Sequence, residues 1–217
     1  MNKLIELDQA LSFINDGDTI MVGGFLGNGT PETIVDGLVA SGKKDLTLIC
    51  SDTGFVDKGS GKLVANKQCK RIYASHVGTN KETGRQMSAG ETEVILTPQG
   101  SLAEKIRAAG YGLGGALTKT GLGTEVEKGK EIITIDGEQW LLEKPLHADV
   151  ALVFADTVDT AGNLIYKSAE ANFNNVMAAA GKITIVEARN LVEAGQLDPN
   201  TVHTPGVFVN YIVKGGN

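Results

Sequence analysis

Residues 16–31, Asp-Gly-Asp-Thr-Ile-Met-Val-Gly-Gly-Phe-Leu-Gly-Asn-Gly-Thr-Pro, most constrain the fold of this chain. Thr19–Val22 is a short apolar run between turn residues, which is typical of a strand buried on both faces. A glycine-rich segment follows, and glycine lets a backbone bend sharply and approach a ligand closely. Thr30 suits a helix N-cap and Pro31 the first helical position. The stretch predicts free backbone N–H groups and a helix N-terminus at a sheet edge, where anions or polarised carbonyls bind.

The spacing of the glycines excludes two common phosphate-binding loops. Gly24-x-x-Gly27-x-Gly29 differs from the dinucleotide pattern G-x-G-x-x-G, and no Lys-Ser or Lys-Thr follows as in a P-loop. Gly110, Gly112 and Gly115 fit the dinucleotide letters, but the residues before them predict a helix rather than a strand. A loop that joins a strand to a helix without binding anything is the alternative interpretation.

The whole of residues 16–31 resembles the first signature of the family I coenzyme A transferases. The signature requires three apolar residues, then Gly-Gly-Phe, and a final Gly-x-Pro, and the chain meets each of these positions. Further similar blocks occur at residues 97–110, 121–124 and 204–207. The resemblance therefore covers nearly the whole chain and is closest to the acetate/butyrate–acetoacetate branch of the family.

Composition indicates a globular protein that does not bind nucleic acid. Hydrophobic residues make up 41% of the 217 residues and charged residues 21%, enough to bury a core. The net charge of −6 argues against nucleic acid as the main partner. The two cysteines, Cys50 and Cys69, have no metal-like spacing, and Cys50 is expected to be a buried thiol, so we expect a reducing, cytoplasmic location. We expect one domain over residues 1–217, no secretory signal, no membrane-spanning segment and no metal site.

Strand-like and helix-like segments alternate along the chain. We expect strands at Thr19–Val22 and at residues 46–50, 71–77, 94–97, 150–154, 183–186 and 207–213, and helices at residues 8–15, 31–40, 101–109 and 174–180. Asp136-Gly137 predicts a type I′ hairpin between residues 131–135 and 138–142, and residues 110–129 are expected to form a long glycine-rich loop. The predicted fold is α/β, a mostly parallel, doubly wound sheet with flanking helices, glycine-rich loops at its carboxyl edge and a small hairpin excursion.

The resemblance implies a reaction, but the motif that carries the catalytic glutamate of this reaction is missing from the chain. In the family, a glutamate in a Ser-Glu-Asn-Gly-like motif attacks the acyl-CoA, and the resulting mixed anhydride is converted into a glutamyl-CoA thioester. This motif is absent here; Glu170 in residues 168–172 is the nearest imitation, and Glu187 after a predicted strand is the next candidate. The resemblance therefore implies an α subunit that is active only with a β subunit carrying the glutamate, in an α2β2 assembly.

The site residues follow from the resemblance and from position. Gln99 stands between a predicted strand and a predicted helix, and the matching glutamine of the family contributes to the oxyanion hole; a helix-capping role is the alternative. Phe25 suits either stacking or the core. Coenzyme A is implied as a substrate, with no permanently bound cofactor, in contact with Gly24, Phe25, Leu26, Gly27, Asn28, Gly29 and Thr30.

Other polar residues are expected to have structural or surface roles. The three histidines lie far apart in the sequence, and Lys119 and Lys128 are the lysines of the glycine-rich loop that could meet CoA phosphates. The histidines are His76, His147 and His203.

Four functions are in competition. The main prediction is transfer of coenzyme A among acetate, butyrate and acetoacetate, and succinyl-CoA:3-oxoacid transfer is the alternative within the family. A sensor of phosphorylated ligands would use a related fold but usually carries a DNA-binding segment, which this acidic chain lacks. A dehydrogenase with Asp52 on a ribose disagrees with the glycine order.

Overall fold

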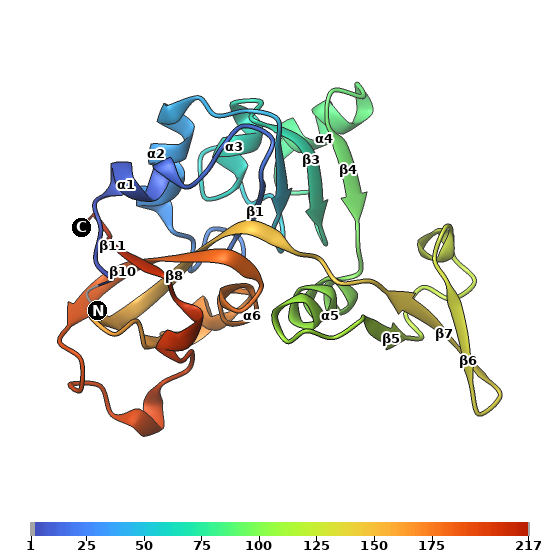
Figure 1. The fold of residues 1–217 in the computed structure, drawn as a ribbon. Coiled ribbons are helices and arrows are strands. Elements are labelled where there is room, and N and C mark those ends of the chain that lie inside the picture. Colours follow the sequence, from blue (N-terminus) through green and yellow to red (C-terminus); the bar gives the residue numbers. More distant parts are fainter. Residues whose placement is uncertain (1–2, 217) are drawn as a thin grey trace.

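A parallel sheet organises the chain, of which the computed structural model describes residues 3–216 (Figure 1). Its strands run in the order β11-β10-β8-β1-β2-β3-β4, all parallel, with β9 antiparallel on β8. The strands are β1 (Thr19–Val22), β2 (Leu46–Ile49), β3 (Cys69–Ala74), β4 (Glu93–Leu96), β8 (Ala148–Asp159), β9 (Leu164–Ile165), β10 (Gly181–Val192) and β11 (Tyr211–Lys214). The predicted domain of residues 1–217 reaches beyond the described residues at both ends.

Helices cover both faces of this sheet because the strands are apolar on both sides. Met21 of β1 packs into one core with α5 and α6, whereas its neighbours Ile20 and Val22 pack into the other core with α1, α2 and α3. The helices are α1 (Leu7–Ser12), α2 (Glu32–Ser41), α3 (Gly61–Ala65), α4 (Lys81–Ser88), α5 (Gln99–Gly110) and α6 (Asn174–Ala178). The predicted doubly wound α/β fold is thereby confirmed.

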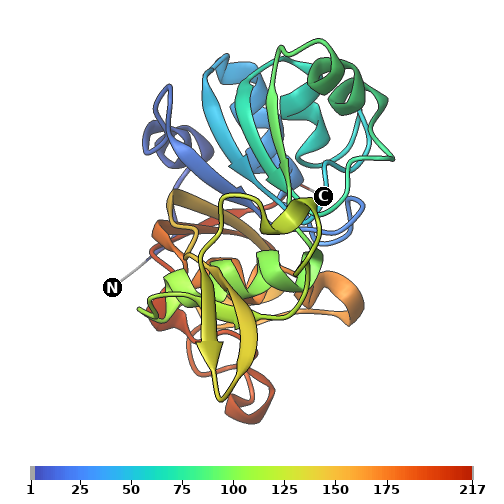
Figure 2. The same cartoon turned by 90° about the vertical axis from the view of Figure 1, so that its right-hand side faces the viewer.

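A three-stranded antiparallel arm projects from the main sheet beside α5 (Figure 1), and in Figure 2 this arm faces the viewer. It consists of β5 (Ala116–Thr118), β6 (Ile132–Ile135) and β7 (Glu138–Glu143). Asp136 and Gly137 have φ angles of 51° and 81°, as a type I′ turn requires, so the predicted hairpin excursion is confirmed. At the base of the arm, Glu143 is buried and pairs with Lys105 and Lys130.

Several boundaries differ from the sequence-based expectation. Residues 110–129 are not wholly a loop, because β5 pairs with β7 and a 3-10 turn forms at Glu125–Glu127. β8 and β10 are longer than predicted, and residues 207–213 form a 3-10 turn (Gly206–Phe208) followed by β11. Two further 3-10 turns lie at Ser168–Ala171 and Pro199–Thr201. The helices α3 and α4 were not predicted, because α3 is a single short turn and α4 is mainly polar.

The predicted start of the helix after β1 was wrong. α2 begins at Glu32, Pro31 occupies the N-cap position, and no side chain caps the helix. Thr30 is buried instead, and its hydroxyl lies against Gly24, where an added Cβ would come within 2.1 Å of Oγ1. Thr30 therefore packs the preceding loop rather than capping the helix.

Candidate active site

Two loops of the same design lie side by side at the carboxyl edge of β1 and β2. The first loop (residues 24–30) reads Gly-Phe-Leu-Gly-Asn-Gly-Thr, and the second loop (residues 54–60) reads Gly-Phe-Val-Asp-Lys-Gly-Ser. Phe25 forms an isolated antiparallel β-bridge with Asn28, and Phe55 forms the same kind of bridge with Lys58. The sequence analysis missed the second loop, although the repeat of Gly-Phe and Gly-Thr/Ser thirty residues later signals it.

Asp52 ties the two loops together. Its carboxylate is buried and accepts hydrogen bonds from the N–H of Leu26, at 3.2 and 3.3 Å, and of Gly54, at 2.8 Å. Asp52 is only 4% exposed and bonded to both loops, so its carboxylate serves the structure of this edge rather than an exposed ribose site. This geometry, together with the glycine spacing, argues against the dehydrogenase interpretation.

The tips of both loops expose large apolar side chains. Phe25, Leu26, Phe55 and Val56 are 36–40% exposed. Of the two alternatives for Phe25, the core position was therefore wrong, and stacking on a flat group stays a prediction. Adjoining exposed apolar side chains of this size are typical of binding surfaces.

Gly23, just before the first loop, and Gly29 within it make room for other parts of this chain. A Cβ on Gly23 would lie 1.8 Å from Oδ1 of Asn174, and one on Gly29 would lie 2.9 Å from Cα of Glu170. The N–H groups of Gly24, Phe25, Leu26 and Asn28 also donate within the chain. The prediction of a loop with generally free N–H groups was therefore wrong.

A pocket of about 410 Å³ lies beside the first loop. Its lining consists of Phe25, Leu26, Ser75, His76, Thr79 and Gln99. Gln99 is the first residue of α5, which follows the end of β4 after Thr97 and the N-cap residue Pro98. Nε2 of Gln99 lies 3.4 Å from Oγ of Ser51. The structure thus brings Gln99 to the tip of the first loop, as the sequence-based position implied.

The other predicted loop residues lie away from this pocket. Gly24, Gly27 and Thr30 line a narrow gap between the two loops. The carbonyl groups of Asn28 and Gly29 accept hydrogen bonds from Asn172 and Asn174. Among the predicted loop residues, Phe25 and Leu26 are therefore those that share the pocket with Gln99.

Ser75, His76 and Thr79 are pocket residues that the sequence analysis did not identify. Residues 71–77 were predicted as one strand, but β3 ends at Ala74. His76 still forms an isolated parallel bridge with Asp52, and residues 77–80 then lead into α4. Ser75 donates to the carbonyl of Ser51 at 2.7 Å, and Thr79 donates to that of Gly54 at 2.7 Å. The sequence signal that could have predicted a loop here is the occurrence of Ser75, His76 and Gly78 directly after the strand.

Glu170 and Glu187 occupy buried positions outside the pocket lining. Glu170 pairs with Arg189 at 2.8 Å and accepts the N–H of Lys167 at 2.9 Å. Glu187 accepts the hydroxyl of Thr33 and the N–H of Ile34, both at 3.0 Å. Both carboxylates are committed to structural contacts, so neither is placed to attack an acyl group in the pocket.

Burial raises the pKa of Glu187 above its ordinary value of 4.5, although the Thr33 and Ile34 donors partly oppose the shift. A carboxyl with a raised folded-state pKa stabilises the fold below its unfolded pKa, and this contribution is lost as the pH rises through the folded pKa. We therefore expect the melting temperature of Glu187→Gln to fall less than that of the unchanged protein as the pH rises from about 4.5 to 7. Thermal melts across this range test the expectation, with exposed Glu131→Gln as the control; parallel curves for all three proteins would contradict it.

Among the remaining candidates, His203 and the two lysines have local partners, and the other two histidines are exposed. His203 accepts the N–H of Tyr166 through Nδ1 at 3.0 Å, which is a structural role. His147 is exposed, and His76 is exposed on the pocket wall. Lys119 pairs with Glu138 and Lys128 pairs with Glu125, each at 2.7 Å.

Both cysteines are free and buried, and burial raises the pKa of each thiol. Within residues 3–216, no group of three or more His, Cys, Asp or Glu side chains is arranged to hold a metal ion. In the same described range, the helices are too short or too polar to cross a bilayer.

Comparison with known proteins links this fold to one family. The chain is 53% identical over 211 residues to the alpha subunit of the acetate CoA-transferase of Escherichia coli, with 97% of this chain and 96% of that protein covered. It is 52% identical to the acetoacetyl-CoA:acetate/butyrate CoA transferase alpha subunit of Clostridium acetobutylicum, with 98% of both covered. One subunit of a probable succinyl-CoA:3-ketoacid coenzyme A transferase of Bacillus subtilis is 48% identical, with 96% of this chain and 88% of that protein covered.

Solved structures share the fold at lower sequence identity. Glutaconate coenzyme A-transferase from Acidaminococcus fermentans superposes with a TM-score of 0.86 at 22% identity, over 98% of this chain and 75% of that one. An acyl-CoA transferase from Escherichia coli O157:H7, in a thioester complex with CoA, gives a TM-score of 0.83 at 22% identity, over 97% of this chain and 46% of that one. The family model for coenzyme A transferase matches residues 4–215. On this match and on the identities above 50%, the chain belongs to the coenzyme A transferase family.

Proposed function

We propose that this chain is the α subunit of a CoA transferase that moves coenzyme A among the short-chain acids acetate, butyrate and acetoacetate. The observation that carries the proposal is the pocket in which Gln99 meets the tip of the first loop. The names of the relatives support it, since two proteins more than 50% identical are α subunits named for acetate, butyrate or acetoacetate.

The nucleophilic glutamate is proposed to come from a β subunit. The residues that line the pocket include no carboxylate, and Glu170 and Glu187 are buried in other contacts. The exposed apolar tips of the two loops support a partner that covers this edge of the sheet, because such side chains gain most from burial. An α2β2 assembly is the proposed form.

Coenzyme A is proposed as a substrate rather than a permanent cofactor, in contact with the first loop. The apolar side chains of Phe25 and Leu26 form one wall of the pocket and Gln99 stands on another. In the described part of the chain, the N–H groups of Gly27, Gly29 and Thr30 have no acceptor. Gly29 and Thr30 are buried and Gly27 is half-buried, so the N–H of Gly27 is the loop donor most accessible to a phosphate or a thioester carbonyl.

The proposed role of Gln99 is to stabilise the negative charge that develops on the thioester carbonyl oxygen. When the β-subunit carboxylate attacks the acyl-CoA, the carbonyl oxygen becomes an oxyanion and the CoA thiolate leaves, forming a mixed anhydride. The side-chain amide of Gln99 donates an N–H to this oxygen, and the thiolate then attacks the glutamyl carbonyl to release the first acid. The acceptor acid reverses these steps, so atoms and charge balance without any further reactant.

The function is tested by acetyl transfer from acetyl-CoA to butyrate and to acetoacetate, with this chain alone and with its β subunit. We expect activity only in the mixture, because the nucleophile and the pocket lie on different chains. Transfer by this chain alone would contradict the proposal and point to an overlooked nucleophile.

The choice of acid separates the two branches of the family. Succinyl-CoA:3-oxoacid transfer is the alternative, since a relative 48% identical carries that name with the qualifier probable. Faster transfer from succinyl-CoA than from acetyl-CoA to acetoacetate would favour it. No transfer with any donor would favour a sensor of phosphorylated ligands. A cytoplasmic location is part of the proposal, supported by two free, buried thiols.

A further inference from the structure

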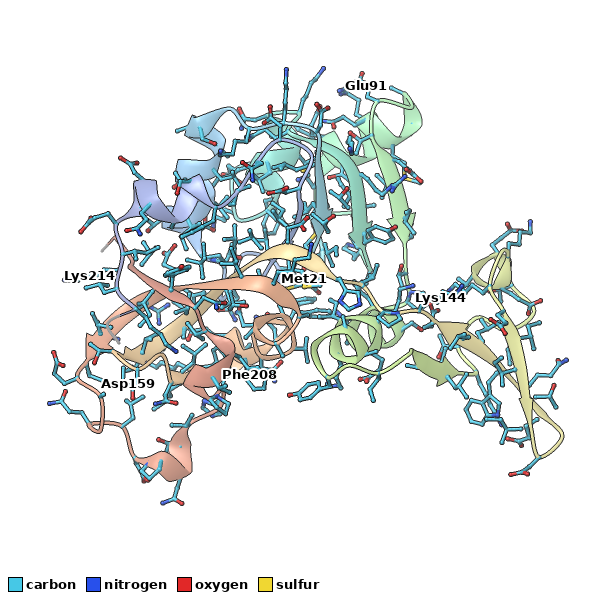
Figure 3. The ribbon with its side chains drawn as sticks, in the orientation of Figure 1. Met21, Glu91, Lys144, Asp159, Phe208 and Lys214 are labelled. Carbon is cyan, nitrogen blue, oxygen red and sulfur yellow. The ribbon has the colours of Figure 1, made fainter. Side chains whose placement is uncertain are left out.

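The order in which the chain adds strands to the main sheet reverses between β1 and β8. From β1 the strand order runs through β2, β3 and β4 on one side, and through β8, β10 and β11 on the other. In open α/β sheets, ligands bind in the crevice outside the carboxyl ends of the strands at such a switch point. The first loop leaves β1 at this point, three residues after Met21, which is labelled near the centre of Figure 3.

A buried asparagine lies against the end of the first loop near this point. Asn174 is fully buried, and its Oδ1 accepts the N–H of Phe154 on β8 at 3.0 Å. Its Nδ2 donates to the carbonyl of Gly29 at 2.7 Å and to that of Glu170 at 2.8 Å. One side chain therefore joins β8, the end of the first loop and the 3-10 turn before α6, and both amide hydrogens and the amide oxygen are used.

A second asparagine holds the other side of the loop. Asn172 donates from Nδ2 to the carbonyl of Asn28 at 3.0 Å and to that of Ala169 at 2.7 Å. Its Oδ1 accepts the N–H of Gly24 at 3.2 Å. Asn172 and Asn174, which we call the asparagine clamp, therefore hold Gly24, Asn28 and Gly29 and leave the tip of the loop to Asp52.

The clamp is itself fixed to the sheet by an ion-pair network. Glu170, in the turn before the clamp, pairs with Arg189 of β10, and Arg189 also pairs with Asp156 of β8. The guanidinium of Arg189 lies 4.8 Å from the centre of the Phe154 ring. The turn therefore cannot shift without separating partners on two central strands.

We propose that Asn172 and Asn174 are positioning residues, which hold the first loop so that Phe25 and Leu26 face Gln99 across the pocket. This inference rests on the proposed function for its kinetic consequence, but not for its structural one. The loop carries one wall of the pocket, so a loosened loop samples positions in which that wall is displaced. Substrate then binds the fraction of molecules with an ordered loop, which raises the apparent KM more than it lowers kcat.

Asn172→Ala is the principal test, since Asn172 is only half-buried and its loss leaves the fully buried Asn174 in place. We expect amide hydrogen exchange at Gly24, Phe25, Leu26 and Asn28, whose N–H groups donate within the chain, to become about tenfold faster, as for the loss of one net hydrogen bond. We expect the KM for acetyl-CoA, measured in the complex with the β subunit, to rise by a similar factor. Asn190→Ala is the matched control, because the exposed Asn190 donates one bond to the carbonyl of Asp156 and does not touch the loop.

The outcomes separate this inference from the proposed function. Unchanged exchange in the first loop of Asn172→Ala would overturn the inference, and so would equal acceleration in Asn190→Ala. Faster exchange with unchanged KM would overturn the positioning role and also the proposed contact of this loop with coenzyme A. If the complex is inactive before any substitution, the proposed function fails while the exchange result still decides whether the clamp holds the loop. If Asn172→Ala does not fold, Asn172→Asp keeps the acceptor for Gly24 but loses the donor to Asn28, and the same comparison is made with it.

Discussion

Gly23→Ala is expected to lower the melting temperature of this protein by about 10 °C, as for an overpacked core site that costs about 3 kcal/mol. The added Cβ would lie 1.8 Å from Oδ1 of Asn174. Asn174 cannot move aside, because it is fully buried and bonded to Phe154, Gly29 and Glu170. Differential scanning calorimetry of the purified chain measures the effect.

Gly84→Ala is the matched control for this substitution. Gly84 lies inside α4, and nothing stands within 4 Å of an added Cβ. Alanine at an open helical position is expected to stabilise the protein by up to about 1 kcal/mol. Equal melting temperatures for Gly23→Ala and the unchanged protein would show that Gly23 and Asn174 do not lie as close together as described.

Gln99→Ala is expected to reduce kcat for acyl transfer in the complex about ten- to a thousandfold, while the melting temperature stays within a degree or two. One oxyanion-hole donor contributes a hundred- to a thousandfold in a water-excluded site, and less where water can replace it. The stability should hardly change because Gln99 is exposed and makes one weak side-chain contact, 3.4 Å from Ser51. Steady-state transfer from acetyl-CoA measures the effect.

Gln139→Ala, on the exposed surface of β7 in the arm, is the control for the loss of a glutamine amide. It should retain full activity, because the arm does not line the pocket. Full activity of Gln99→Ala would sink the oxyanion assignment. Equal losses in both variants would indicate an effect on assembly rather than on the transition state.

Elements with strong local patterns were predicted well. β1 was placed at its observed residues, since an apolar run between turn residues has few alternative structures. The Asp136-Gly137 turn was placed correctly because both residues tolerate positive φ. The helices α3 and α4 were missed, since their stability comes from packing beside the loops that follow β2 and β3 rather than from an apolar stripe. The single domain over residues 1–217 stays a prediction.

The site was predicted in part. The proximity of Gln99 to the first loop followed from two strand ends in one parallel sheet, and the pocket brings them together. The second loop and the turn with His76 were missed, because the strands before them, β2 and β3, come into line beside β1 only in the folded sheet. The roles proposed for Gln99 and for the loop residues in binding coenzyme A stay predictions.

A dense local motif constrains both backbone and ligand, so the family, the α/β class and the edge of the sheet at which chemistry is expected could be read from residues 16–31 and the blocks that follow. The function of the glycines became clear only from the folded chain. Gly23 and Gly29 leave room for Asn174 and Glu170, which lie about 150 residues further along the chain. A local pattern reveals that a backbone must be approached closely, but which group approaches it depends on contacts between distant segments, and these exist only once the sheet has formed.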